Sequence, residues 1–359
     1  MKTIVYQLNA QNANNLKAIE HAAQIIKSGG LVAFPTETVY GLGANALSND
    51  ACAKVYAAKG RPTDNPLIMH IADMSALESI AKDIPPEAKK LMEHYWPGPL
   101  TIILNRAVDA YVNRDCDAFE NVAFEKNVPR GTFLKTVAVR MPNNPIALEL
   151  IHAAGVPIAA PSANISGRPS PTTAKHVLED LEGLIDMVLD GGACEVGLES
   201  TVIDFTESVP IILRPGAITA EMVKGHIGDV KEHMQNEQLE GGQAPKSPGM
   251  KYKHYAPLAK LTIVTGDEQR VNKTINAALQ NKSREKTGIM VMGNDDKYNW
   301  PNVLKMGNDA DEVAANLFLM LRLCDDMGLD EVYVEGLEES GIGVAIMNRL
   351  KKAASYNII

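Results

Sequence analysis

KGRPTDNPLIMH at residues 59–70 and APSANISGRPSPT at residues 160–172 decide the fold and the site of this chain. In each stretch, cations, hydroxyls and an amide lie between Pro and Gly residues, which favour loops beside short apolar strands. Stiff loops with fixed donors can bind phosphate or a small zwitterion without a metal cage. The alternative is ordinary Pro-rich connectors with exposed side chains, and several such strings on one chain disfavour that interpretation.

Short strands alternate with helices around these loops, and some connecting turns are too short for a crossover. The pattern predicts an α/β domain with a mixed sheet over residues 1–222. Residues 106–135 are irregular and polar, and they receive no assignment. The expected strands are 31–34, 66–71, 100–104, 136–140, 158–160, 187–190, 200–204 and 211–214, and the expected helices are 14–28, 50–58, 75–82, 85–95, 145–154 and 173–181.

A polar stretch with EHMQNEQLEGGQ at its centre follows this domain, and residues 223–257 are expected to be a linker. Residues 258–359 then alternate strand and helix, which predicts a smaller three-layer α/β domain with a parallel sheet. Its expected strands are 261–265, 288–292 and 331–335, and its expected helices are 268–281, 310–326 and 341–354.

The composition narrows the class of protein. The net charge is −9, and since nucleic-acid affinity comes mostly from neutralised phosphates, a strong RNA binder is disfavoured, although a local basic cleft is compatible with the sequence. Four scattered cysteines without a CxxC offer neither a zinc site nor a disulfide framework. Without a signal-peptide pattern or an apolar run that could span a bilayer, we expect a cytoplasmic protein with no membrane partner.

The sequence contains no Walker A string, GxSxG or HExxH, which points to chemistry by positioning and charge stabilisation. Lys59 and Arg61 can both face one anion, unless they are solvated surface cations. Arg140 at a strand end can clamp a carboxylate or phosphate, unless it forms a structural ion pair. Ser162 and Asn164 follow an apolar strand, where open α/β sheets place ligands, unless they form a capping or Asx turn.

Several long strings stand out along the chain: PTETVYGLG (35–43), KGRPTDNPLIMHI (59–71), WPGPLT (96–101), VAVRMP (137–142), APSANISGRPSPT (160–172), GLESTVID (197–204), LRPG (213–216), PGMKYKHYAP (248–257) and GIGVAIMNRLKKAAS (341–355). Together they resemble the YrdC-type threonylcarbamoyl-AMP synthases. The resemblance covers almost the whole chain, and the last two strings are similar to the longer, two-domain members of the family.

The resemblance implies a nucleotidyltransferase that condenses L-threonine, bicarbonate or CO2, and ATP into threonylcarbamoyl-AMP and pyrophosphate. A downstream threonylcarbamoyl transferase complex then modifies tRNA beside the anticodon, so tRNA is an indirect partner. It also implies a twisted mixed-sheet domain around a positively lined cleft, a Rossmann-like C-terminal domain, and a linker that covers the cleft.

The family's functional positions are carried over residue by residue. The resemblance assigns Lys59, Arg61, Ser162 and Asn164 to catalysis, and Thr38, His70, Arg140, Ala160 and Ser200 to threonine binding. It assigns Arg61, Asn65, Thr136, Ser162, Ser170, Arg214 and, in the linker, Tyr252 to ATP binding.

The expected mechanism uses no protein nucleophile. The threonine amine attacks CO2 or bicarbonate, and the carbamate oxygen attacks the α-phosphorus of ATP. Mg²⁺ that enters with ATP, together with Lys59 and Arg61, offsets the developing charge, and no protein-bound metal cage is expected. The alternative function is an RNA-binding protein that uses the same cleft. A carbamoyl transferase of the hydrogenase-maturation type would need zinc fingers that these cysteines cannot build.

The linker generates the first prediction. If residues 246–257 exclude water from the labile carbamate, their deletion will release or hydrolyse the intermediate faster. Following the intermediate by chromatography over time tests this, and unchanged kinetics would contradict the lid role.

Overall fold

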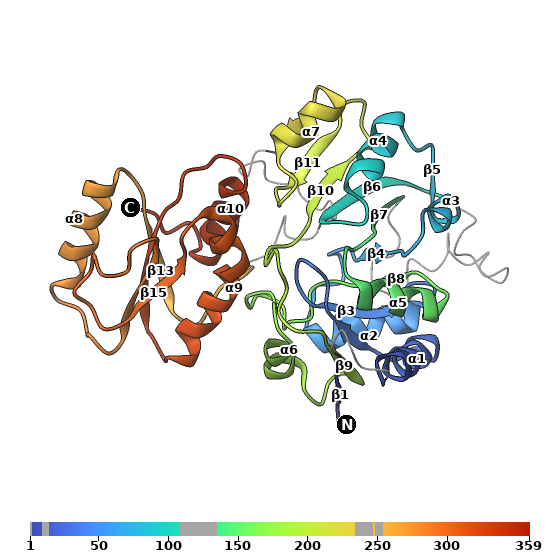
Figure 1. Cartoon of the computed structure of the whole chain (residues 1–359), viewed down its shortest axis with the longest axis horizontal. Helices are drawn as coiled ribbons and strands as arrows, with labels where there is room; N and C mark the ends of the chain where they lie inside the picture. The colour runs from blue at the N-terminus through green and yellow to red at the C-terminus, as the bar shows by residue number, and fades with distance from the viewer. Residues whose placement is uncertain (1, 9–13, 108–134, 234–246, 248–253) are drawn as a thin grey trace.

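The structure is a computed structural model that describes residues 2–8, 14–107, 135–233, 247 and 254–359. It contains two α/β units, each built on its own sheet, with the second unit in orange and red at the left of Figure 1. The fold class predicted from the sequence is confirmed. Most of the expected linker and most of residues 106–135 lie outside the described residues.

The first unit contains a 12-stranded mixed sheet. The strands are β1 (Ile4–Gln7), β2 (Val32–Phe34), β3 (Gly41–Asn45), β4 (Ile68–His70), β5 (Ala81–Lys82), β6 (Leu100–Arg106), β7 (Thr136–Arg140), β8 (Ile158–Ala159), β9 (Met187–Asp190), β10 (Thr201–Asp204), β11 (Ile211–Arg214) and β12 (Lys231–Glu232). Their order is β1-β9-β2-β3-β8-β4-β7-β6-β10-β11-β12, with β5 paired to β6. Parallel pairs such as β4–β7 alternate with antiparallel pairs such as β6–β7.

Helices cover this sheet because each has one apolar face. In the first helix, Ala18, Ile19, Ala22, Ala23 and Ile26 are buried at helical spacing against β2 and β9. The helices are α1 (Asn14–Lys27), α2 (Asn49–Lys59), the short 3-10 turn η1 (Met74–Ala76), α3 (Leu77–Ile80), α4 (Pro86–Tyr95), α5 (Pro145–Ala154), α6 (Ala174–Leu181) and α7 (Ala220–Ile227). Helices α1 and α5 pack on one face, α2 and α6 on the other, and α4 with α7 on the β6–β10 end.

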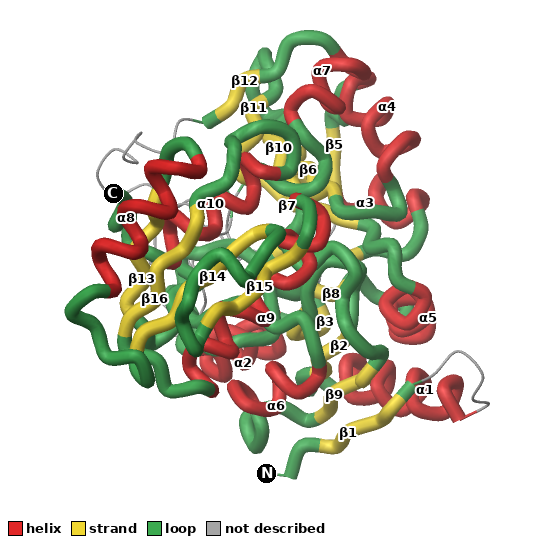
Figure 2. Tube along the Cα trace, turned by 60° about the vertical axis from the view of Figure 1, so that its left-hand side comes forward, coloured by secondary structure: helices red, strands yellow, loops and turns green. Residues whose placement is uncertain are grey.

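The second unit has a four-stranded parallel sheet between two helix layers (Figure 2). Helix α8 packs on one face, and α9 and α10 pack on the other, so this unit has the three layers expected from its sequence. Its elements are β13 (Lys260–Val264), α8 (Glu268–Leu279), β14 (Thr287–Met292), β15 (Val303–Gly307), α9 (Ala310–Asp326), β16 (Glu331–Glu335) and α10 (Gly343–Ala353), and the strand order is β13-β16-β14-β15.

Some elements differ from the expectations. Strands β1, β3 and β15 are absent from the expected set, and residues 81–82, expected to be helical, form β5. The sequence of β3, GLGAN, has low strand propensity, and its conformation comes from pairing with β2 on one side and β8 on the other. Helix α7 and strand β12, which pairs with β11, carry ordered structure past residue 222 into the stretch expected to be linker.

The two units share an apolar interface. Val39 and Leu198 of the first unit belong to the same buried cluster as Leu317 and Phe318 of α9 and Ile346 of α10. In Figure 1, α9 and α10 lie between the small sheet and the first unit. The interface therefore buries side chains of both units in one core.

Gly197 generates a prediction for this interface. Its φ is +73°, and a Cβ built on it would lie 2.5 Å from the Ala314 carbonyl oxygen of α9. Gly197→Ala therefore combines a left-handed backbone cost of about 1 kcal/mol with a steric cost of about 1–3 kcal/mol. We expect a clearly lower melting temperature in differential scanning fluorimetry.

The matched control is Gly192→Ala. Gly192 has a φ of +88°, and a Cβ built on it would have no described atom within 4 Å. This variant carries the backbone cost alone. Equal losses of melting temperature in the two variants would contradict a close approach of α9 at Gly197.

Candidate active site

A pocket opens between the two long loops, the ends of β4, β7, β10 and β11, and residues 254–255. The space between its walls is about 700 Å³ when the open solvent at its mouth is included. Both Pro- and Gly-limited strings, at residues 59–70 and 160–172, therefore meet at one cavity. The predicted site residues in its wall are Lys59, Arg61, His70, Arg140, Ala160, Ser162, Asn164, Ser170, Ser200 and Arg214.

Other predicted site residues do not line the pocket. Thr38 is fully buried, and its hydroxyl lies 2.9 Å from that of Thr36, which does line it. Asn65 is buried, and its backbone carbonyl accepts a hydrogen bond from Arg61 Nε. Thr136 is the first residue of β7 and pairs with Asn105 of β6. Tyr252 lies outside the described residues.

Lys59 is placed by the end of helix α2. Ser48 caps the helix start, and Gly60, with φ of 58°, ends the helix in the left-handed conformation immediately after Lys59. Lys59 is 1% exposed, and its ammonium donates to the carbonyl oxygens of Ser162 and Asn164. Lys59 is therefore the last helical residue and not a loop residue as expected, and the solvated-cation alternative is wrong.

Arg61 is also buried, and it holds the turn that follows the helix. Its guanidinium donates from Nε to the Asn65 carbonyl at 3.2 Å and from Nη2 to the Pro66 carbonyl at 2.8 Å. Burial lowers the pKa of Lys59 well below its usual value, helped by the charge of Arg61, and burial lowers the pKa of Arg61 to about 10. A bound anion would offset this desolvation, because it would favour both charged forms.

Ser162 and Asn164 organise the loop opposite Lys59. Ser162 forms an antiparallel bridge with Gly41, and its hydroxyl donates to Asn164 Oδ1. The Asn164 amide nitrogen donates to the Ile165 carbonyl at 2.8 Å and to the Arg168 carbonyl at 2.9 Å. Asn164 thus braces the turn that follows it by donating to two carbonyls, which differs from a cap or an Asx turn because there the side-chain oxygen accepts a backbone N–H, and it also lies in the pocket wall.

Arg140 and His70 form a second part of the pocket. They are register partners in the parallel strands β7 and β4, which brings both side chains to one place. Arg140 forms an ion pair with Glu37 at 2.8 Å and donates from Nε to the Gly98 carbonyl at 3.3 Å. The structural ion pair considered for Arg140 is present, and the side chain still faces the pocket. Burial, with the charge of Arg140, lowers the pKa of His70 to about 3, so His70 is neutral near pH 7.

Arg214 and Ser200 lie at the ends of β11 and β10. Arg214 donates from Nε to the Ser200 carbonyl at 3.0 Å and from Nη2 to the Ser200 hydroxyl at 3.2 Å. Nearby, the Ser170 hydroxyl donates to Glu199 at 2.6 Å. This wall offers a guanidinium and several hydroxyls beside one carboxylate.

Sequence reasoning missed several residues of this site. Glu37 forms the ion pair with Arg140. The pocket wall also contains Glu199, His254 and Tyr255. Arg349 of α10 donates to Glu199 at 2.9 Å. These residues lie inside the quoted strings, but nothing in the local pattern shows which long-range partner each one has. The available signal for Arg349 was a cation within the apolar face of α10, where it is 0% exposed.

Comparison with known proteins gives the family. Residues 24–216 match the Sua5, YciO and YrdC family model described as "Telomere recombination", and residues 218–355 match the model described as "Threonylcarbamoyl-AMP synthase, C-terminal domain". A threonylcarbamoyl-AMP synthase of Pyrococcus abyssi is 46% identical over 95% of this chain and 95% of its own length. The chain belongs to the threonylcarbamoyl-AMP synthase family.

Two further relatives support this membership. The threonylcarbamoyl-AMP synthase of Bacillus subtilis is 44% identical over 97% of this chain and 96% of its own length. The crystal structure of Pyrococcus abyssi Sua5 complexed with L-threonine has a TM-score of 0.87 and 44% identity, and covers 100% of this chain and 99% of that one. Both domains of the family are therefore present in this chain.

Two features concern metals and membranes. Within the part of the chain that the structure describes, no group of three or more His, Cys, Asp or Glu side chains could hold a metal ion. No helix among the described residues is both long and apolar enough to traverse a bilayer.

The buried His70 generates a pH prediction. Its folded pKa of about 3 lies below the unfolded value near 6.5, so only the unfolded chain takes up this proton as the pH falls. The stability contributed by neutral His70 is therefore present above about pH 6.5 and is lost as the pH falls toward 3. Between pH 7 and pH 5 the loss is about 2 kcal/mol.

We expect His70→Gln to make the free energy of unfolding, measured by denaturant titration, less sensitive to pH in this interval. His152→Gln, at an exposed position of α5, is the control. An unchanged pH dependence in His70→Gln would contradict a neutral buried imidazole.

Proposed function

We propose that the pocket condenses L-threonine, CO2 or bicarbonate, and ATP into threonylcarbamoyl-AMP and pyrophosphate. Membership of the family makes the chain an enzyme, a transferase that forms an AMP adduct. The observation that carries the proposal is that one pocket holds two buried cationic centres, Lys59 with Arg61 in one part and Arg140, beside the neutral His70, in another. Two separate cationic centres suit the phosphates of ATP and the carboxylate of an amino acid.

Arg140 is the group best placed for the threonine carboxylate. A guanidinium binds a carboxylate through two parallel hydrogen bonds, and the ion pair of Glu37 with Nη2 at 2.8 Å, together with the donation from Nε to the Gly98 carbonyl, holds this guanidinium in place. The relative solved with L-threonine supports an amino-acid site in this pocket. His70 and Ser200 supply neutral donors or acceptors at this end, which suits the substrate hydroxyl.

Lys59 and Arg61 suit the phosphates. Their present partners are neutral carbonyl oxygens, so an ATP phosphate would supply the negative charge that the buried cations lack. Arg214 and Ser170 extend this wall toward the rest of the nucleotide. Thr38, Asn65, Thr136 and Tyr252 keep their predicted binding roles as proposals.

The reaction needs two bond-forming steps. The threonine nitrogen attacks the carbon of CO2 and loses a proton to solvent, which gives a carbamate. A carbamate oxygen then attacks the α-phosphorus, the bond to the bridging oxygen breaks, and pyrophosphate leaves. Lys59 and Arg61 hold the phosphates and offset the charge that develops on them.

We expect Mg²⁺ to enter as part of the ATP substrate. Among the described residues that line the pocket, Glu199 is the carboxylate, and both its oxygens already accept hydrogen bonds, from Ser170 and Arg349. The charge of Arg349 helps lower the pKa of Glu199 to about 2 against the opposing effect of burial. Glu199 is thus committed to neutralising arginine and is a poor candidate for a resident metal.

We expect the product to pass to a downstream threonylcarbamoyl transferase complex that acts on tRNA, and we expect the reaction to occur in the cytoplasm. Direct RNA binding in the cleft is disfavoured. A strand of RNA needs exposed cations along a groove, whereas Lys59 is 1% and Arg61 is 8% exposed in an acidic chain.

The decisive measurement is pyrophosphate release from ATP in the presence of L-threonine, bicarbonate and Mg²⁺. We expect release that requires threonine and bicarbonate, with serine as the control substrate. Lys59→Ala and Arg61→Ala should each lower kcat about 10²–10³-fold, because each removes charge stabilisation at the phosphates.

Lys54→Ala is the matched control, since Lys54 lies on the same helix and donates to the Gly29 carbonyl at the surface. This variant should keep parental activity. Absence of threonine-dependent release in the parent enzyme would overturn the proposed function.

A further inference from the structure

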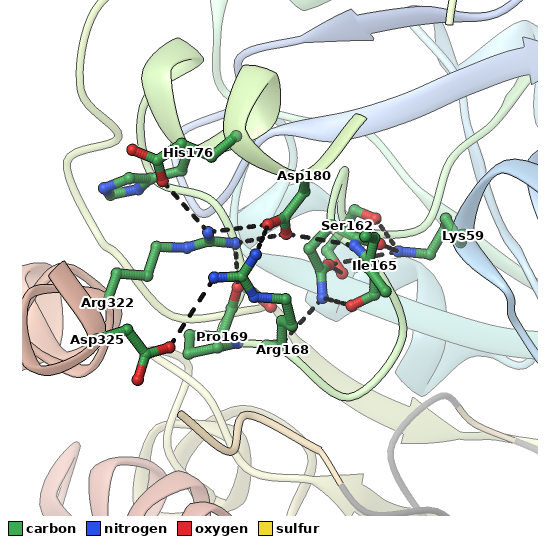
Figure 3. Close-up of polar contacts among 12 residues, drawn as sticks. Lys59, Ser162, Ile165, Arg168, Pro169, His176, Asp180, Arg322 and Asp325 are labelled. Atoms are coloured by element: carbon green, nitrogen blue, oxygen red, sulfur yellow. Dashed lines mark hydrogen bonds and ion pairs between the residues drawn. The ribbon is translucent and has the colours of Figure 1, made fainter. Parts of the chain in front are cut away.

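Asp180 of α6 is a buried carboxylate that accepts hydrogen bonds from three residues in two distant parts of the chain. Its side chain is 0% exposed, and it accepts from Arg168 at 2.7 Å, from the Ile165 backbone N–H at 3.3 Å, and from two nitrogens of Arg322 at 2.8 and 3.2 Å. Figure 3 shows these donors converging on one carboxylate. Asp180 therefore joins the loop that follows β8 to helix α9 of the second unit.

Arg322 holds this loop at a second point. It is 2% exposed, and its Nη2 also donates to the Pro169 carbonyl at 2.6 Å. A guanidinium that binds both a carboxylate and a backbone carbonyl fixes the position of one relative to the other. The second unit thus determines where residues 165–169 lie.

The held loop is also the loop that contacts Lys59. Asn164 donates to the Arg168 carbonyl, and Lys59 donates to the carbonyls of Ser162 and Asn164. In return, the Ser166 backbone N–H donates to the Lys59 carbonyl at 2.8 Å. A continuous path of hydrogen bonds therefore runs from Arg322 through Asp180 and the loop to Lys59, as Figure 3 traces.

We propose that Arg322 and Asp180 are positioning residues, through which the C-terminal domain holds the Ser162–Asn164 loop against Lys59 in the geometry that turnover requires. The proposal rests on the proposed function for its kinetic readout. It gives the C-terminal domain a role in the reaction through Arg322, a residue that lies behind the pocket wall and does not line the pocket itself.

The alternative is that the pair only fastens the two units together. A buried ion pair does not by itself show a gain of stability, so the geometry needs a test that separates fastening from positioning. Without Arg322, Asp180 would keep the Ile165 N–H and Arg168, whose side chain is 36% exposed. The loop would then have a weaker anchor on the side away from Lys59.

The test compares three variants of the full chain. Arg322→Met removes the charge and keeps much of the volume, whereas Arg322→Lys keeps the charge without the two-pronged contact. Asp326→Asn is the matched control, because Asp326 forms an exposed contact between the same two helices, with Lys175 at 3.7 Å. All are assayed for pyrophosphate release and for hydrogen–deuterium exchange, well below their melting temperatures.

We expect Arg322→Met to lower kcat roughly 10–100-fold, as misplacement of a catalytic group does, while KM for threonine changes less than about threefold. Threonine affinity is preserved because Arg140 and His70 belong to β7 and β4, and because the backbone N–H of Ala160, at the start of the loop, donates to the Ile68 carbonyl of β4 at 2.9 Å independently of Arg322. Exchange should accelerate in residues 160–170 and stay unchanged in residues 200–214. The kcat and the exchange rate of Arg322→Lys should lie between those of Arg322→Met and the parent. Asp326→Asn should match the parent in both.

Unchanged kcat with a lower melting temperature in Arg322→Met would overturn the proposal and leave a fastening pair. Faster exchange throughout both units would overturn it as well. If Arg322→Met does not fold, Arg322→Lys is used for the test. In that case, a kcat and an exchange rate of Arg322→Lys equal to those of the parent would overturn the proposal. If the parent shows no threonine-dependent release, the proposed function fails, and the exchange of residues 160–170 still decides whether Arg322 holds the loop.

Discussion

The burial of Lys59 is the constraint on which the rest of the site depends. An ammonium that is 1% exposed has lost its water, so the chain must supply acceptors around it. Those acceptors are backbone carbonyls of Ser162 and Asn164, from a loop about a hundred positions away in the sequence. The loop must therefore be held in place, and much of the surrounding structure performs that task.

Neutral acceptors leave the charge of Lys59 uncompensated, and this has a functional consequence. A carboxylate in their place would form a satisfied ion pair and would compete with phosphate. The carboxylates near the site instead pair with other arginines, Glu37 with Arg140, and Glu199 of the pocket wall with Arg349. Under the proposed function, Lys59 and Arg61 thus keep their affinity for an incoming phosphate.

The second unit reaches the first through two buried arginines. Arg322 of α9 binds Asp180, and Arg349 of α10 binds Glu199 and the Pro215 carbonyl. Both arginines are buried, and Val39, Leu198 and Phe318 belong to the apolar core that the two units share. Because a buried carboxylate without its partner is costly, the two units are coupled at the pocket and not only at their surfaces.

The sequence by itself determined the two α/β units, the motifs and the family, because turn residues, apolar runs and long specific strings are local properties of the chain. It also identified Lys59, Arg61, Arg140, Ser162 and Asn164, since those residue types beside strand ends suit anion binding. Only the tertiary structure decided that Lys59 ends a helix and lies buried, that GLGAN forms β3, and that Arg140 pairs with Glu37. It alone joined Arg322 to Asp180 and Arg349 to Glu199 across 142 and 150 positions, because such pairs are selected by packing between units and leave no pattern in the local sequence.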